Sequence, residues 1–431
     1  MQHLEINPIK VSIRGDYWDC QIYRGRLYLW TYNGDLLVYD WVKFVDSLIE
    51  DDMDRVAIEC ALNRGDYFYK KEMSLLFNDK EVKELLLKKF TKVASKQFEF
   101  EENEIEEYLY GHQLNPFKEL SIDTDIYNNK IYSITEEGLL STTAHRNNKK
   151  YPVSSRNKKI WDCPLLSIKV SKGGRIALSA GNEGLFEYDI HNRVGFNKEL
   201  TKVDNVAYHL SKQHSIFSNW SFSSIYSSSD VKESFMSAFC WEEDNTENNH
   251  IFINEVLKNK GDKKLSFKGN FLDKDIFKNS QPKRLSWGGN EKLYRVNDNG
   301  LDVVTFTQTL LKTGEESSPF SEVNNIEFQA WKGRIIAGGT ANFGTIVQCE
   351  FALVVLLSNG SYYNIPGEVT RWRVYPKSHR YENHLHVIFE DRIDIYSFNN
   401  DYFVDQDKKH LGMKYSDNNN RRGRGFVRVN N

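Results

Sequence analysis

A short pattern that returns along the chain constrains the fold more than any other feature of this sequence. Residues 22–40 read IYRGRLYLWTYNGDLLVYD, which is an apolar alternating run, the pair Asn33-Gly34 and a second alternating run. This arrangement predicts a β-hairpin, because Asn and Gly tolerate the positive φ of a tight turn. Further copies occupy 126–142, 172–189, 290–306, 331–337 followed by 354–365, and 383–398, with a weaker copy at 203–228. The chain is therefore predicted to repeat one hairpin unit.

The residues before two of the hairpins also repeat. Trp18-Asp19-Cys20 precedes the first hairpin and Trp161-Asp162-Cys163 precedes the third. We interpret the two tripeptides as corresponding positions of one copied unit. Each unit then has a lead-in strand, a hairpin whose first run is nearly all apolar, and a more polar outer edge. This gradient is typical of a propeller blade, whose inner strands are buried on both faces.

On these repeats the chain resembles the β-propeller superfamily, in its divergent WD-repeat-like or kelch-like forms. The resemblance covers most of the chain outside residues 42–115 and is one of pattern. The Trp-Asp pairs open a unit instead of closing a strand, and Gly173-Gly174 and Gly338-Gly339 are out of register with kelch double glycines. The resemblance implies an all-β fold, a single propeller of about seven blades, with six as the alternative. It indicates no specific family, so no functional residue is carried over.

The repeats also divide the chain. Residues 1–41 are expected to form the first blade and a closing strand, 42–115 a helical insertion, 116–410 the remaining blades, and 411–431 a tail rich in Arg, Gly and Asn. Residues 4–13 are expected to pair beside 383–398, because closure of the ring removes exposed strand edges. Side chains on the inner runs should be buried, namely Leu27, Leu29, Ile131, Ile176, Leu178, Leu293, Ile335 and Val387.

The segment 42–110 breaks the β pattern and shows helical spacing instead. Asn78-Asp79-Lys80-Glu81 has the form of a capping box, with Asn in place of Ser or Thr, and an apolar stripe follows it. The segment ends in an acidic run at 99–107. It is either a decoration packed over one face of the propeller or an arm that docks a protein partner. The candidate partner-binding residues are Val82, Leu85, Leu86, Phe90, Glu101, Glu102 and Glu104.

Composition restricts the setting of the protein. The net charge of −3 gives no overall attraction to nucleic acid or to an anionic membrane. No secretory signal and no membrane-spanning apolar run is visible, since the longest run, 351–357, has the length of a strand. Five scattered cysteines without a C-x-x-C favour a reducing compartment, so a cytoplasmic location is expected.

The C-terminal tail is a basic segment. It carries Arg421, Arg422, Arg424 and Arg428 among Gly and Asn. The tail is either solvated, with an edge strand at 426–429, or in contact with phosphate groups, for which arginine-glycine segments are suited.

Catalytic motifs are not visible in the sequence. There is no phosphate-binding G-x-x-x-x-G-K-[ST], no G-x-S-x-G nucleophile elbow and no H-E-x-x-H. His384 and His386 share one face of a presumed strand, with His379 nearby, but the sequence supplies no third metal ligand. We therefore predict no catalytic residue, no metal site and no cofactor.

Three functions follow from this interpretation. The first is a non-catalytic protein-interaction scaffold, a propeller subunit of a cytoplasmic complex. The alternative is a metal-dependent hydrolase whose acids, drawn from separate blades, meet in the central channel. The second alternative is a nucleic-acid-binding accessory subunit that acts through the basic tail.

Overall fold

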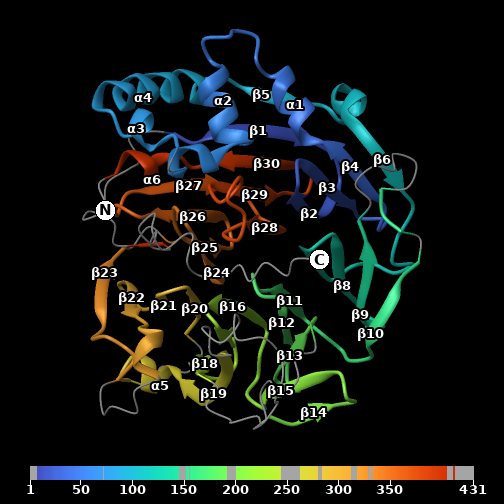
Figure 1. Cartoon of the computed structure of the whole chain (residues 1–431), viewed down its shortest axis with the longest axis vertical. Coiled ribbons are helices and arrows are strands. Elements are labelled where there is room, and N and C mark those ends of the chain that lie inside the picture. Colours follow the sequence, from blue (N-terminus) through green and yellow to red (C-terminus); the bar gives the residue numbers. More distant parts are fainter. Residues whose placement is uncertain are drawn as a thin grey trace, which may run out of the picture.

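Seven sheets surround a common axis in the computed structural model of the chain (Figure 1). The structure describes residues 7–70, 72–144, 152–154, 156–191, 200–243, 263–279, 284–311, 318–328, 331, 333–404 and 411–412. The inner strands of neighbouring blades contact one another around the axis. The chain is a seven-bladed β-propeller, so the prediction of an all-β propeller with seven blades is confirmed.

Each blade is a sheet whose strands run outward from the axis in chain order, except at the edge of blade 3 and in blade 7, whose outer strands come from the N-terminal part of the chain. Blade 1 has β2 (Tyr17–Tyr23), β3 (Arg26–Thr31), β4 (Leu36–Asp40) and β6 (Leu109–Gln113). Blade 2 has β7 (Asp123–Tyr127), β8 (Lys130–Thr135), β9 (Gly138–Thr143) and β10 (Lys158–Trp161). Blade 3 has β11 (Ser167–Val170), β12 (Arg175–Ser179), β13 (Leu185–Asp189) and β15 (Ala207–Ser211), with the short β14 (Lys202–Val203) at its edge.

The other four blades follow the same plan. Blade 4 has β16 (Phe217–Ser221), β17 (Ser224–Ser228), β18 (Phe235–Glu243) and β19 (Lys263–Leu272). Blade 5 has β20 (Ser286–Gly289), β21 (Lys292–Val296), β22 (Gly300–Thr305) and β23 (Asn324–Glu327). Blade 6 has β24 (Ile335–Ala341), β25 (Gly344–Cys349), β26 (Ala352–Leu357) and β27 (Tyr362–Pro366). Blade 7 has β28 (Arg371–Val374), β29 (His384–Ile388), β30 (Arg392–Ser397) and β1 (Ile9–Arg14).

The ring closes through the two ends of the described chain. β1 pairs antiparallel with β30, from Ile9 opposite Ser397 to Arg14 opposite Arg392. The hydroxyl of Ser12 also donates to a carboxylate oxygen of Asp394 at 2.6 Å. The predicted pairing of the N-terminal strand with the last hairpin is thus confirmed.

Turn residues explain why the hairpins form where the sequence predicts them. Gly34 has a φ of 83° between β3 and β4, and Gly138 has a φ of 107° where β9 begins. A Cβ at Gly138 would lie 2.2 Å from the carbonyl oxygen of Trp161, so only glycine fits. The hairpins predicted at 22–40, 126–142, 172–189, 290–306, 354–365 and 383–398 are all observed.

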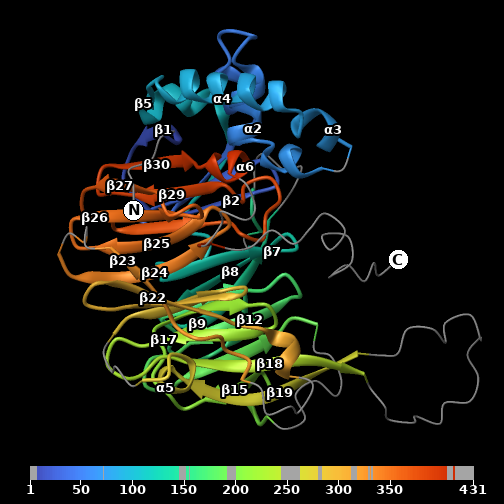
Figure 2. The same cartoon turned by 90° about the vertical axis from the view of Figure 1, so that its left-hand side faces the viewer.

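The helices of the insertion lie along the rim of the disc, as both views show (Figures 1 and 2). Between β4 and β6 the chain forms α1 (Trp41–Ser47), α2 (Arg55–Leu62), η1 (Gly65–Tyr69), α3 (Ser74–Phe77), α4 (Lys80–Ala94), β5 (Phe98–Phe100) and η2 (Glu102–Tyr108). β5 pairs parallel with β1 and becomes the fifth strand of blade 7. The insertion therefore leaves blade 1 and covers the outer edge of the closing blade. Short helical turns also occur at α5 (Asp273–Ile276), η4 (Gln308–Leu311) and α6 (Asn400–Phe403).

The core lies between the blades and beneath the insertion. Seven of the eight inner-run residues predicted to be buried are at most 1% exposed. Ile335 is the exception, because it begins the inner strand β24 at the surface end and is only half-buried. Burial in that strand starts at Gly338.

Three details of the sequence interpretation were wrong. Residues 203–228 are not one copy, since β15 is the outer strand of blade 3 and β16 and β17 begin blade 4. Trp18 lies on the inner strand β2, whereas Trp161 ends the outer strand β10, so the two tripeptides are not equivalent positions. The cap of α4 is Asp79, whose carboxylate accepts from the backbone of Glu81 and Val82, because Asn78 lies one residue too early.

Two further expectations concern the surroundings of the protein. Among the described residues, no helix is both long enough and apolar enough to cross a membrane. None of the five cysteines, all of which the structure describes, is in a disulfide bond.

Candidate functional site

Three inner strands bring opposite charges together at the axis. Asp19 of β2 and Asp123 of β7 both accept hydrogen bonds from the guanidinium of Arg373 on β28, at 2.7–2.9 Å and 2.5 Å respectively. Arg371 lies 3.4 Å from Asp19 and 3.5 Å from Asp123. We call these four residues the axial cluster. It joins blades 7, 1 and 2, the blades on both sides of the closure.

Backbone and hydroxyl groups complete the hydrogen bonding of the two carboxylates. Asp19 accepts from the backbone of Cys20 at 2.8 Å and from the hydroxyl of Thr124 at 2.8 Å. Asp123 accepts from the backbone of Ile168 at 2.9 Å, on the inner strand of blade 3. The carboxylates are therefore held as fixed structural anions, each with several donors.

The charges of the axial cluster stabilise one another. Burial by itself raises the pKa of Asp123, but Arg373 and Arg371 outweigh it and the pKa is lowered. Burial by itself lowers the pKa of Arg373, but Asp123 and Asp19 outweigh it and hold that pKa well above its usual value. Both groups stay charged at neutral pH, so the cluster offers neither a free base nor a free acid.

A second ion pair lies beside the axial cluster. Lys377 donates to Asp125 of β7 at 2.9 Å, and the same carboxylate accepts from the backbone of Val170 at 2.8 Å. Burial lowers the pKa of the neighbouring Lys169 on β11. Within the described ranges, no group of three or more His, Cys, Asp or Glu side chains is arranged to hold a metal ion.

A neutral hydrogen-bonded chain links this region to the insertion. His384 Nε2 lies 3.0 Å from the carbonyl oxygen of Ala61 in α2, and His384 Nδ1 lies 3.4 Å from His386 Nε2. His386 Nδ1 lies 3.1 Å from the hydroxyl of Tyr375, which is 3.8 Å from the thiol of Cys20. We call Cys20, Tyr375, His386 and His384 the histidine chain.

The carbonyl of Ala61 fixes the direction of every bond in the histidine chain. A carbonyl only accepts, so His384 carries its proton on Nε2 and accepts at Nδ1 from His386 Nε2. His386 then accepts at Nδ1 from Tyr375, which in turn accepts from Cys20. Burial lowers the pKa of His384 to about 4 and, together with His384, lowers that of His386 well below its usual range. The pair is a satisfied neutral unit and is not a metal site.

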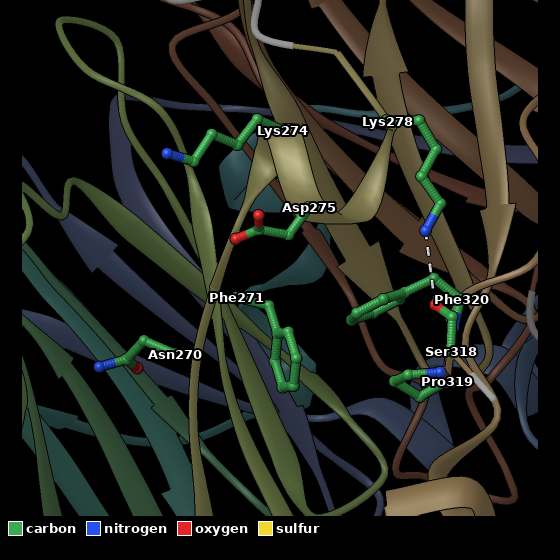
Figure 3. A pocket seen from close by; sticks show the side chains of 8 residues that line it. All are labelled: Asn270, Phe271, Lys274, Asp275, Lys278, Ser318, Pro319 and Phe320. Carbon is green, nitrogen blue, oxygen red and sulfur yellow. Dashed lines mark hydrogen bonds between the residues drawn. The ribbon is translucent and has the colours of Figure 1, made fainter. Parts of the chain in front are cut away.

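A hollow of the described surface lies between α5 and residues 318–320 (Figure 3). It has a volume of about 720 Å³ and contains Phe271, Phe320 and two lysines. Lys278 donates to the hydroxyl of Ser318 at 3.5 Å, and Asp275 accepts from the backbone of Leu272 at 3.0 Å. These polar groups are engaged locally and do not converge on a common point, so the hollow is not a built catalytic site.

The structure separates the partner-binding residues predicted in the insertion. Leu86 and Phe90 are 4% and 2% exposed and pack in the core that α4 shares with β1, and Val82 packs partly against it. Leu85 points outward and is 54% exposed. The apolar stripe therefore packs within the molecule, and of its predicted residues only Leu85 is exposed.

The acidic residues of η2 are exposed, as a docking role requires. Glu101, Glu102 and Glu104 all lie at the surface. Glu101 also lies 3.2 Å from Arg14 of β1, and Glu104 accepts from the backbone of Glu101 at 2.7 Å. The four tail arginines, Arg421, Arg422, Arg424 and Arg428, and the edge strand considered at 426–429 lie outside the described residues.

The sequence did not reveal the axial cluster. Its members come from three blades, and Arg373 is 354 positions from Asp19. The only visible signal was an acidic residue within an inner strand, as at Asp19 and Asp123. The histidine pair was seen, but its partner Ala61 was not.

No protein family and no curated protein matches the sequence. Solved structures that it resembles include the β-propeller domain of Myceliophteria thermophila Cps50 (Swd1), with 8% identity, a TM-score of 0.45 and coverage of 91% of this chain and 100% of that one. YCF48 bound to D1 peptide has 9% identity and a TM-score of 0.43, over 93% and 97% of the two chains. The designed Ika8 protein has 9% identity and a TM-score of 0.43, over 91% and 100%. The assignment to the β-propeller class rests on the seven sheets themselves.

Proposed function

We propose that this protein is a non-catalytic protein-interaction scaffold and a propeller subunit of a cytoplasmic complex. The observation that carries the proposal is the exposure of large apolar side chains on the insertion. Leu75 is 91% exposed, Leu76 52% and Leu85 54%, on the short helix α3 and the neighbouring α4. Exposed leucines on two neighbouring helices support a surface that a partner covers.

The chemistry of the axis supports the same proposal. A hydrolase in the channel needs a carboxylate free to bind a metal or to take a proton. Asp19 and Asp123 are instead neutralised by Arg373 and Arg371, and Asp125 is neutralised by Lys377. These pairs support a structural role for the axis and leave recognition to the surface.

The charge of the insertion suggests the type of partner. Glu101, Glu102 and Glu104 lie at the surface near the exposed end of β5, so a basic partner surface would be steered toward them. Nucleic-acid binding would have to involve the tail arginines instead.

The test is purification of the tagged full-length chain from its native host. We expect a stoichiometric protein partner that is lost from the double variant Leu75→Asp/Leu76→Asp. The control Lys88→Asp changes an exposed side chain of α4 and should retain the partner. A chain that purifies alone, or a partner that both variants retain equally, would contradict the proposal.

A further inference from the structure

One face of the disc gathers acidic and apolar side chains over blades 1 to 3. In each blade the β-ladders place the start of the inner strand, the turn between the second and third strands and the end of the outer strand at the same end of the sheet. The connections at this end are residues 15–16, 32–35, 114–122, 136–137, 162–166 and 180–184. We call these connections the acidic turn sector.

Large apolar side chains of the acidic turn sector are open to solvent. Leu114 is 74% exposed, Leu166 48%, Leu120 44% and Tyr32 42%. The ring of Tyr32 also lies 5.7 Å from that of Trp18, at the start of β2. Apolar groups come from three separate connections of the ring, so they belong to a surface and not to one loop tip.

The charges of the acidic turn sector are almost all negative. The exposed carboxylates are Asp16, Glu136, Glu137, Asp162 and Glu183, and Asp35 and Glu119 are partly exposed. Within these connections Lys118 is the one lysine or arginine, and Lys212 lies at the border beside Gly184. Some of these carboxylates form ion pairs, such as Asp162 with Lys159 at 3.1 Å. The excess of acid nevertheless gives the surface one sign of potential.

The connections are held in place before any partner arrives. The backbone of Asn115 donates to Asp35 at 2.9 Å, and the indole of Trp18 donates to the carbonyl of Ser121 at 2.6 Å. The backbone of Glu137 donates to Glu119 at 3.3 Å, which ties the turn of one hairpin to the preceding connection. A surface ordered in this way loses little conformational entropy on binding.

We propose that the acidic turn sector binds a basic segment of a partner protein in which Lys or Arg alternate with apolar side chains. The carboxylates would pair with the basic residues, and Tyr32, Leu120 and Leu166 would cover the apolar ones. The inference rests on the proposed scaffold function and adds a second surface to the insertion. Charge complementarity selects this occupant, because an acidic or uncharged apolar segment would meet uncompensated carboxylates.

The test uses the full-length protein and three fluorescent twelve-residue peptides, of alternating Arg and Leu, Arg and Ser, and Glu and Leu. Anisotropy should show binding of the Arg-Leu peptide, weaker binding of the Arg-Ser peptide and none of the Glu-Leu peptide. The double variant Glu136→Lys/Glu137→Lys should weaken Arg-Leu binding at least tenfold. The control Glu322→Lys reverses an exposed charge in the connection between the third and fourth strands of blade 5, at the other end of the sheet, and should change it less than twofold. Leu166→Ser should weaken it several-fold without a change in charge.

The outcomes separate this inference from the scaffold function. Arg-Leu binding that is absent, or equal in the sector variant and the control, overturns the sector as a basic-segment site. If the native partner is retained by Glu136→Lys/Glu137→Lys but lost by Leu75→Asp/Leu76→Asp, the scaffold function is supported and the binding role of the acidic turn sector is contradicted. If no native partner is found but the Arg-Leu peptide binds and the sector variant weakens that binding, the binding role of the sector is supported and the proposed scaffold function is contradicted. Melting temperatures of all variants, together with a second sector variant, Asp162→Lys, separate lost binding from lost folding.

Discussion

The closure of the ring is held by two buried polar groups of opposite character. At the axis, Arg373 joins Asp19 and Asp123 through ion pairs. Toward the rim, His384 and His386 join the last blade to Ala61 of the insertion with no net charge. A buried ion needs its partner far more than a neutral group does, because the charge left behind cannot be resolvated. The axial cluster and the histidine chain should therefore lose different amounts of stability when they are disrupted, and should lose it at different pH.

The largest effect is expected from removal of the shared cation at the axis. Arg373→Met leaves Asp19 and Asp123 buried with only the more exposed Arg371, so the free energy of unfolding should fall by about 3–5 kcal/mol. Denaturant unfolding measures it. Arg371→Met removes the longer contacts and serves as the comparison, with a smaller loss expected. Equal losses of stability in the two variants would show that Arg373 contributes no more to the cluster than Arg371 does.

The rim should respond to loss of apolar volume. Leu86→Ala removes a side chain that is 4% exposed in the core beneath α4, and should cost about 2–5 kcal/mol. Leu85→Ala, one residue away and 54% exposed, should change stability by less than about 0.5 kcal/mol. Thermal and chemical unfolding of the matched pair test whether the insertion is part of the closing blade. Similar small effects would mean that the insertion is loosely attached.

Acid should weaken the rim before the axis. Both histidine pKa values are lowered in the folded state from 6.5, that of His384 to about 4, so the unfolded chain binds more protons as the pH falls below 6.5. Each histidine then removes up to about 1.4 kcal/mol of stability per pH unit. Burial raises the pKa of Asp273 to about 6, which opposes one histidine between pH 6 and 4. The lowered pKa of Asp123 makes its own contribution vanish only below about pH 4.

Unfolding curves between pH 7 and 4 measure this dependence. In His386→Phe the fall in stability over that range should be shallower than in the parent protein, because one buried titrating group is gone. A parallel pH dependence in the two proteins would show that His386 does not titrate on unfolding.

The smallest effect is expected from a single hydroxyl in the histidine chain. Tyr375→Phe removes the donor to His386 Nδ1 and the acceptor for Cys20, and should cost about 1–3 kcal/mol. Tyr32→Phe, at a half-exposed tyrosine, is the matched control and should be near neutral. If Tyr375→Phe is also neutral, a water or the thiol of Cys20, 3.7 Å from His386, replaces the hydroxyl.

The sequence was sufficient for the hairpins but not for the sites. Asn33-Gly34 and Asn359-Gly360 predict their turns because the backbone conformation is decided by the residues themselves. The meeting of Asp19 with Arg373 depends on ring closure, which no local pattern encodes. For the same reason the helical stripe was visible, but only packing against β1 shows that Leu86 faces inward and Leu85 outward.

The location of the acidic turn sector also depends on the tertiary fold. Leu114, Leu120 and Leu166 look like ordinary loop residues in the sequence. They become one surface because neighbouring blades present the same end of their sheets on the same side of the disc.

The pairing of β1 with both β30 and β5 has a consequence for synthesis on the ribosome. Ser12 of β1 cannot bond to Asp394 until the ribosome has added 382 more residues. At 5–20 residues per second this synthesis takes about 20–80 s. β5 follows β1 by fewer than a hundred residues and pairs with its other edge, opposite Val11, Ser12 and Ile13. The insertion can therefore shelter one edge of β1 soon after that strand is made, long before the last blade emerges to pair with the other edge.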